Sequence, residues 1–210
     1  MSKSLCVLIL LLAWAIPGSA ATLYFNNFET NDGGWTSSGD WEWGVVNYTG
    51  GGCDSPQVGP AGAASGTSAW GTVLGGCYAN SGATSSLSRQ FDLTGVSDAQ
   101  LEWEQWIHVF TSFDSAQTFV NGVEVYSRIE STGTTDWEKI TVDLTPFVGG
   151  LVTVQFDMFA TTVVNRAGWY IDDVHLTTSG DAVIPEPGTV VMLASALGLL
   201  WFGRRRQSRA

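Results

Sequence analysis

The sequence predicts an all-β domain in which two antiparallel sheets pack face to face as a sandwich. Three observations lead to this class. About ten short segments between residues 22 and 178 are rich in aromatic and branched apolar side chains. Glycine-rich turns separate these segments, and no segment in this range keeps a sustained 3.6-residue period. A domain of about 160 residues is large enough to bury one hydrophobic core.

The expected strands follow from local patterns taken in chain order. Residues 22–29 are aromatic and apolar, and residues 31–34 read Asn-Asp-Gly-Gly, a typical turn sequence. Trp41 and Trp43 lie two residues apart in the next segment, and Pro146 ends a later one. The expected strands are 22–29, 40–46, 69–74, 85–93, 101–110, 116–120, 123–127, 140–144, 151–159 and 169–176.

The clearest local signal is Asn121-Gly122, which stands between two alternating segments. Asn-Gly in this position is typical of a type I′ β-hairpin. The predicted register pairs Val120 with Val123 and places Thr118 and Val125 on the same face.

Segment 101–110 divides into two faces. The apolar face holds Leu101, Trp103, Ile107 and Val109, and the other face holds Glu102, Glu104 and His108. Gln105 falls on the apolar face, so its amide must find a hydrogen-bond partner in the core. Trp106 falls on the polar face, which makes it the best candidate for an exposed aromatic ring.

Both ends of the chain predict export. Residues 1–21 have the pattern of a signal peptide, with Lys3, an apolar run over 5–15 and small residues before the cleavage site. At the other end, residues 179–187 form a linker and residues 188–210 an apolar helix with a basic end. The apolar part spans about 24 Å as a helix, less than the roughly 30 Å hydrocarbon core. An ordinary anchor helix is the alternative.

Three features of this tail follow one another in order: Pro185-Glu186-Pro187, a short apolar helix, and Arg204, Arg205 and Arg206. Together they resemble the PEP-CTERM sorting signal of Gram-negative bacteria that make exopolysaccharide. The resemblance implies recognition and cleavage by the membrane protease exosortase near the Pro-Glu-Pro motif. The arginines stay cytoplasmic by the positive-inside rule. The precursor would be held transiently in the inner membrane and then reach the cell surface or extracellular matrix.

Charge and cysteine content narrow the possible partners. Between Glu29 and Asp181 there are 19 acidic residues against 4 basic ones, a formal charge of −15. Such a field repels nucleic acid and anionic lipid and favours divalent cations. Cys53 and Cys77, in an oxidising compartment, predict a disulfide. A two-cysteine metal site is the alternative, although both histidines lie far away in sequence.

The last strand contains two adjacent acids, Asp172 and Asp173. In regular alternation one carboxylate faces the core whichever face is buried. A buried carboxylate must be protonated, paired or bound to metal, and few basic residues are available. We therefore expect a hard cation such as Ca²⁺. The alternative is that one Asp lies in water at the edge of the sheet.

The domain also resembles the choice-of-anchor J domain, which is related to MAM-type and galactose-binding-like jelly rolls. The resemblance rests on Phe28-Glu29, Gly34-Trp35, residues 91–95, Trp137, residues 142–144 and residues 168–174. It implies a jelly-roll fold over residues 22–178. It also implies a structural Ca²⁺ bound by Glu29 and Asp173, with Asp172 and Asp32 as alternative ligands.

No catalytic motif of a metalloprotease, serine hydrolase or phosphate-binding loop is present in the sequence. We therefore predict a non-enzymatic surface or matrix protein that serves adhesion or exopolysaccharide association. One alternative is a carbohydrate-binding module with a defined sugar site that includes Trp106. The other is a secreted glycan-active hydrolase that uses Glu102 and Glu104.

Overall fold

The computed structural model describes residues 20–54, 56–128 and 136–179, and the structural statements below concern these residues. The predicted signal peptide (1–21, described only from residue 20), all but the first residue of the predicted linker (179–187) and the sorting helix (188–210) lie outside them. In the described part of the chain, no helix is both long enough and apolar enough to cross a membrane.

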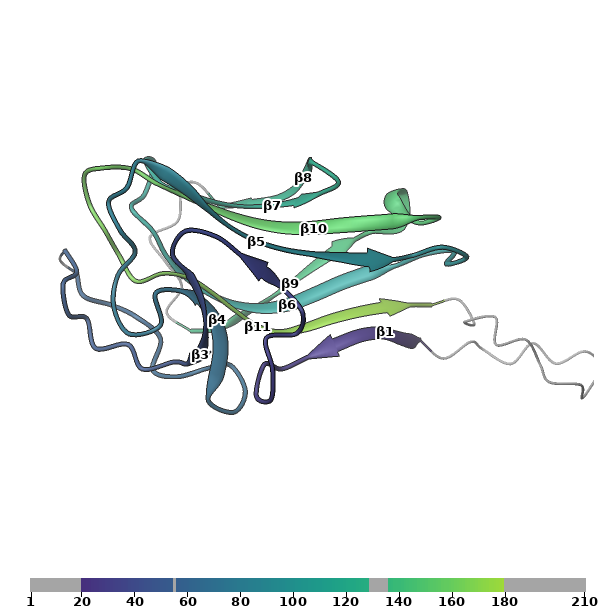
Figure 1. Cartoon of the computed structure of the whole chain (residues 1–210), viewed down its shortest axis with the longest axis horizontal. Coiled ribbons are helices and arrows are strands. Elements are labelled where there is room, and N and C mark those ends of the chain that lie inside the picture. Colours follow the sequence, from purple (N-terminus) through teal and green to yellow (C-terminus); the bar gives the residue numbers. More distant parts are fainter. Residues whose placement is uncertain (1–19, 55, 129–135, 180–210) are drawn as a thin grey trace, which may run out of the picture.

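The domain is a two-sheet antiparallel jelly-roll sandwich, as predicted (Figure 1). The elements are β1 (Ala21–Asn26), β2 (Thr36–Ser37), β3 (Trp41–Val45), β4 (Ser68–Thr72), β5 (Ala83–Asp92), β6 (Gln100–His108), β7 (Ser115–Val120), β8 (Val123–Arg128), β9 (Glu138–Asp143), the 3₁₀ helix η1 (Thr145–Phe147), β10 (Leu151–Ala160) and β11 (Gly168–Thr178). The six-stranded sheet has the order β3-β4-β11-β6-β9, with β1 also paired to β11. The five-stranded sheet has the order β2-β5-β10-β7-β8.

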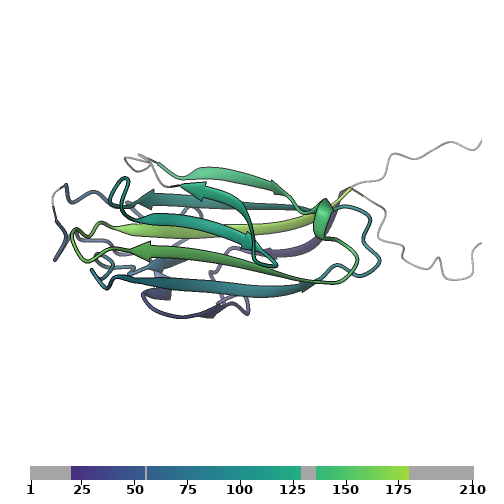
Figure 2. The same cartoon turned by 90° about the horizontal axis from the view of Figure 1, so that it is seen from above.

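The two sheets lie as layers, and their strands run nearly along the long axis of the domain (Figure 2). The first and last strands are direct neighbours, with Ala21 opposite Thr178 and Asn26 opposite Val174. Both ends of the described domain are therefore at the same end of the sandwich.

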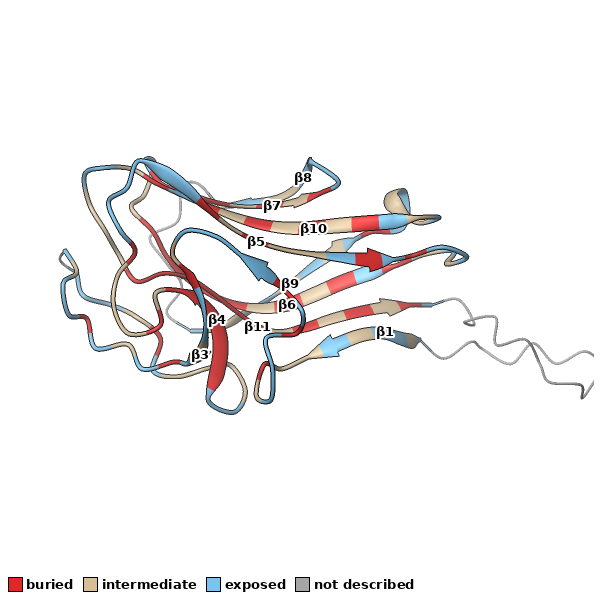
Figure 3. Cartoon of the chain, viewed as in Figure 1, coloured by how far each residue is buried: buried red, intermediate tan, exposed pale blue. Residues whose placement is uncertain are grey.

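The core lies between the sheets, where buried residues alternate with more exposed ones along the strands (Figure 3). Its centre is aromatic: the ring of Phe156 lies 5.2 Å from that of Trp103 and 5.4 Å from that of Trp169, both edge to face. Such pairs stabilise a core by about 0.5–1.5 kcal/mol beyond their buried area. The apolar faces of β6 and β10 thus meet as their period-two patterns predict.

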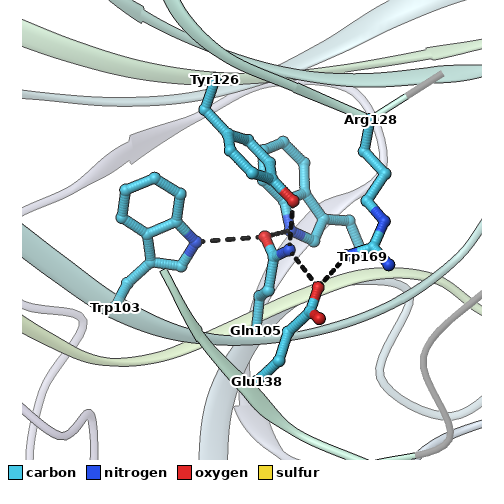
Figure 4. A network of polar contacts seen from close by, with 6 residues as sticks. All are labelled: Trp103, Gln105, Tyr126, Arg128, Glu138 and Trp169. Atoms are coloured by element: carbon cyan, nitrogen blue, oxygen red, sulfur yellow. Dashed lines mark hydrogen bonds and ion pairs between the residues drawn. The ribbon is translucent and has the colours of Figure 1, made fainter. Parts of the chain in front are cut away.

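Gln105 finds its predicted partners in this core (Figure 4). Its side chain is fully buried, and its Oε1 accepts hydrogen bonds from the indole N–H groups of Trp103 (3.2 Å) and Trp169 (2.9 Å). Its Nε2 donates to the hydroxyl of Tyr126 (2.6 Å) and to Glu138 Oε1 (2.8 Å). Arg128 pairs with the same Glu138 oxygen. One amide therefore links β6, β8, β9 and β11 across both sheets.

The hairpin turns at Asn121-Gly122, and both residues have positive φ (49° and 79°), as a type I′ turn requires. Val120 pairs with Val123 as predicted. A β-bulge then shifts the register, so that Tyr126 rather than Val125 lies opposite Thr118. Val125 still packs against the main core, on the face where Thr118 is buried, as predicted. Within the same hairpin, Tyr126 reaches the amide of Gln105.

Candidate functional site

A long loop, residues 47–66, covers one end of the six-stranded sheet on its outer face; residue 55 in it is not described. The disulfide between Cys53 and Cys77 fastens this covering loop, with Cα atoms 5.4 Å apart, and confirms the predicted pair. Further contacts hold the loop down: His108 Nδ1 lies 3.1 Å from the carbonyl oxygen of Val58, and Trp137 Nε1 donates to the carbonyl of Gly62 (3.1 Å).

Trp106 lies under this covering loop, in a second small core on the outer face of the sheet. The buried members of this core are Val46, Ala69, Leu74, Trp106, Ala167 and Tyr170. Only 2% of Trp106 is exposed, so the prediction of an open stacking ring is wrong. The period-two alternation of the strand placed Trp106 correctly on the outer face. The loop that buries it is long and has few hydrophobic residues, so its sequence did not predict that it packs there.

A β-bulge at Asp173 interrupts the alternation of the last strand and changes which side chains face the core. Two residues, Asp173 and Val174, lie opposite one residue of β6, and Asp173 has φ 47°. Trp169 and Ile171 before the bulge, and Val174 after it, all face the main core. The bulge leaves both Asp172 and Asp173 on the outer side, so neither carboxylate enters the main core. The predicted burial of one carboxylate is nevertheless confirmed, because Asp172 is fully buried under the covering loop.

Three of the four predicted calcium ligands contact residues 65–68, where the covering loop ends and β4 begins. Glu29 Oε1 accepts hydrogen bonds from the backbone N–H groups of Thr67 (2.8 Å) and Ser68 (2.7 Å). Asp172 Oδ2 accepts from the N–H of Ser65 (3.0 Å), and Asp173 Oδ1 accepts from the Ser65 hydroxyl (2.9 Å). These carboxylates hold the end of the loop by pairing with its donors.

The fourth predicted ligand, Asp32, instead accepts from the N–H of Gly34 (2.8 Å). Within the described ranges, no three His, Cys, Asp or Glu side chains come together in a group that could hold a metal ion. The carboxylate oxygens of these residues are ligands of the kind that Ca²⁺ prefers, but their observed arrangement does not form a carboxylate cage. A structural Ca²⁺ stays a prediction.

Asp172 is fully buried, and burial raises its pKa from 3.8 to about 7. The folded protein then holds a proton that the unfolded chain has already lost at pH 4 to 7. We expect Asp172 to lower the free energy of unfolding as pH rises through this window, by at most about 1.4 kcal/mol per pH unit. The measurement is the difference in free energy of unfolding between wild type and Asp172→Asn across that range.

The same experiment, repeated with added calcium, tests whether a metal ion binds at Asp172. A bound Ca²⁺ favours the charged carboxylate. If the difference in free energy of unfolding between wild type and Asp172→Asn depends less on pH when calcium is added, this supports a metal at Asp172. Identical curves in calcium and in chelator contradict a calcium ion at Asp172.

Beyond the covering loop, the outer face of the same sheet is open and forms a shallow hollow of about 240 Å³, which we call the sheet hollow. Its lining residues are Phe25, Glu102, Glu104, Lys139, Asp173 and His175. The pairing of β1 with β11 and of β11 with β6 sets Phe25, His175 and Glu102 in one cross-strand row.

The charges of the sheet hollow are unbalanced. Glu102 Oε2 lies 3.5 Å from Lys139 Nζ and its Oε1 accepts from the Thr141 hydroxyl (3.3 Å). Glu104 has a raised pKa, mainly because of partial burial and further because of Asp173 and Glu102, while Lys139 opposes the shift. His108, which shares this sheet face with the two Glu residues, is buried at the other end under the covering loop, where burial lowers its pKa.

Sequence reasoning identified Glu102, Glu104 and Asp173 but missed Phe25, Lys139 and His175 as parts of one surface. A signal for Phe25 was available, because Leu23 and Phe25 alternate with Tyr24 in the first strand. The partner strand could not be read from that alternation.

A second hollow, of about 340 Å³, lies beside the covering loop. Trp137, which is partly exposed, and the edge of Trp106 line it together with Asp136 and small residues of the loop, Gly59 and Ala61–Ala64. It brings Trp137 together with Trp106, the predicted stacking residue, without exposing either ring fully.

Comparison with known proteins gives two sequence matches and a group of similar solved structures. Residues 183–207 match the model of the PEP-CTERM protein-sorting motif. The chain is 32% identical over 161 residues to Bacillopeptidase F of Bacillus subtilis (strain 168). That match covers 73% of this chain but only 10% of the relative, so the chain spans about a tenth of the length of the curated relative it matches.

Several solved structures are similar to this chain. The K1 cleaved adhesin domain of Lys-gingipain from Porphyromonas gingivalis W83 is 16% identical with a TM-score of 0.46, over 78% of this chain and all of that one. The CBM22-1 xylan-binding domain of Xyn10C from Paenibacillus barcinonensis is 15% identical with a TM-score of 0.44, over 80% of this chain and all of that one. TmCBM61 in complex with β-1,4-galactotriose is 18% identical with a TM-score of 0.46, over 77% of this chain and 94% of that one.

Proposed function

We propose that this chain is an exported protein that exosortase cleaves near Pro185-Glu186-Pro187 and releases to the cell surface or extracellular matrix of a Gram-negative bacterium. The observation that carries this proposal is the match of residues 183–207 to the PEP-CTERM protein-sorting motif. The disulfide supports it, because such bonds persist in oxidising compartments outside the cytoplasm.

The delivered domain is a rigid jelly roll that serves adhesion or exopolysaccharide association. Its finer type, choice-of-anchor J or MAM-like, is proposed on the residue landmarks quoted from the sequence. We propose no enzymatic activity: the similarity to Bacillopeptidase F covers a tenth of that protein and does not transfer a peptidase.

A carbohydrate-binding module with a defined sugar site is the second candidate. The observation that favours it is the sheet hollow, where a 55% exposed Phe25 stands beside carboxylates and a lysine on rigid paired strands. Aromatic rings with nearby hydrogen-bonding groups are the usual elements of sugar recognition.

The sorting proposal predicts a loss of processing when the signal is damaged. In a host that has an exosortase, intact-mass analysis should find that the wild-type chain has lost its Arg204–Arg206 end. Pro185→Ala with Pro187→Ala, or Gln at all three arginines, should leave most of the chain at full length in the membrane fraction.

The matched control replaces the three arginines with lysine, which keeps the positive charge that holds this end in the cytoplasm. This variant should still reach the membrane in the same orientation and be processed. A wild-type chain that keeps its arginine end in the presence of an active exosortase would contradict the proposal.

A further inference from the structure

The sheet hollow is a preformed surface rather than a gap in the packing. Its residues come from four paired strands, β1, β11, β6 and β9, so its shape is set by the sheet. It lies on the open part of the outer face, beside the covering loop, whose Ser65 contacts the hollow at Asp173. A rigid, open, mixed polar and aromatic hollow can receive a ligand without rearrangement.

One wall of the hollow is an aromatic ring held in place from behind. Phe25 is 55% exposed, and its ring meets that of His175 edge to face at 5.5 Å. His175 is itself fixed, since its Nε2 lies 3.0 Å from the hydroxyl oxygen of Thr22. The ring therefore offers an apolar surface that loses little freedom when a flat apolar face of a ligand packs on it.

The rest of the hollow offers more acceptors than donors. It contains three carboxylates, Glu102, Glu104 and Asp173, against one lysine, and that lysine already pairs with Glu102. Asp173 Oδ1 accepts a hydrogen bond from the Ser65 hydroxyl. Among the residues that the structure describes, none donates a hydrogen bond to the carboxylate of Glu104. A ligand that brings donors and positive charge is complementary to this set, and a ligand that brings a carboxylate is repelled.

A sugar ring that carries an ammonium group meets both requirements, because its C–H face is apolar and its edge donates N–H and O–H hydrogen bonds. We propose that the sheet hollow is a glycan-binding subsite selective for amine-bearing sugars, such as the glucosamine units of a partly deacetylated hexosamine polymer. The inference rests on the proposed matrix association and deepens it by naming the class of glycan. A polymer of this charge is also attracted by a domain of formal charge near −15.

The test uses the full-length chain in a neutral detergent, at mildly acidic pH and moderate salt, with binding measured by calorimetry. The probes are short oligomers of glucosamine, of N-acetylglucosamine and of galacturonate, and an oligolysine of equal length. Glucosamine should bind about tenfold more tightly than N-acetylglucosamine, as expected for one charge-assisted hydrogen bond, and galacturonate should not bind. Galacturonate binding as well as glucosamine, or equal affinity for the two hexosamines, would overturn the selectivity.

Two variants place the binding in this hollow. Phe25→Ala and Glu104→Gln should each weaken glucosamine binding by about tenfold. Phe113→Ala, at an equally exposed phenylalanine, and Glu124→Gln, with the same change of net charge on the other sheet, should leave it unchanged. Phe25→Trp should retain binding and shows that a loss in Phe25→Ala comes from the ring.

Oligolysine separates a glycan subsite from a general attraction for cations. It should bind weakly and lose nothing on Phe25→Ala, because a flexible peptide does not use the ring. If oligolysine binds as tightly as glucosamine and depends equally on Phe25, the hollow is a peptide site and the proposal fails. The readout is independent of sorting: a chain that exosortase ignores would still show or lack this binding.

Discussion

Replacing Cys53 with serine lowers the free energy of unfolding by about 3.5 kcal/mol. The cross-link joins residues separated by 24 positions, and removing it restores the corresponding chain entropy to the unfolded state. The variant should also let the covering loop open locally, because this bond fastens the loop over Trp106. Denaturant unfolding gives the global value, and hydrogen exchange of the Trp106 indole reports the opening of the loop.

The control for this prediction is reduction of the wild-type protein. Reductant should destabilise the wild type by about the same amount as Cys53→Ser and should leave Cys53→Ser and Cys77→Ser unaffected. The double variant should equal each single one, because either removes the same bond. Equal stability of wild type and Cys53→Ser would mean that the loop is held by its hydrogen bonds alone.

Replacing Gln105 with leucine should cost about 3–5 kcal/mol, although leucine is more hydrophobic than glutamine. The change leaves the indole N–H groups of Trp103 and Trp169 without their acceptor in the core. Each buried donor that loses its partner costs about 1–3 kcal/mol. Denaturant unfolding measures the loss, with m-values compared to check that the transition stays two-state.

A double variant shows whether the unpaired indoles are the cause. Trp103→Phe added to Gln105→Leu removes one of the two indole N–H groups left without an acceptor. The double variant should therefore lose less free energy of unfolding than the sum of the two single variants. Gln117→Leu, a partly exposed glutamine on β7, is the matched control and should change stability by about 0.5 kcal/mol or less. Strict additivity of Trp103→Phe and Gln105→Leu would contradict the explanation.

Local patterns in the sequence were enough to find every long strand. All ten expected strands correspond to strands of the structure, and the Asn121-Gly122 turn follows from neighbours in sequence. The need for a partner at Gln105 followed from the cost of burying an amide, but the identities of its partners did not. The missed strand, β2, has two residues, which is too short for any periodic signal.

The errors that concern the site share one cause, which is contact between residues far apart in sequence. The bulge at Asp173 depends on how β11 pairs with β6, and no glycine at this position signals it. The burial of Trp106 depends on where a loop rich in Gly, Ala and Ser docks. The sheet hollow depends on β1 lying beside β11, which brings Phe25 to His175 across 150 positions of chain.

The place of β11 in the six-stranded sheet also bears on the export proposed for this chain. In the six-stranded sheet, β11 is the central strand on which β1, β4 and β6 all pair, yet it is the last to be synthesised. A chain that is threaded from its N-terminus through a narrow pore carries the other strands across before their common partner arrives. If the chain is exported as proposed, the six-stranded sheet lacks its central strand until the end of the domain has crossed, and long-range pairing of this kind is slow.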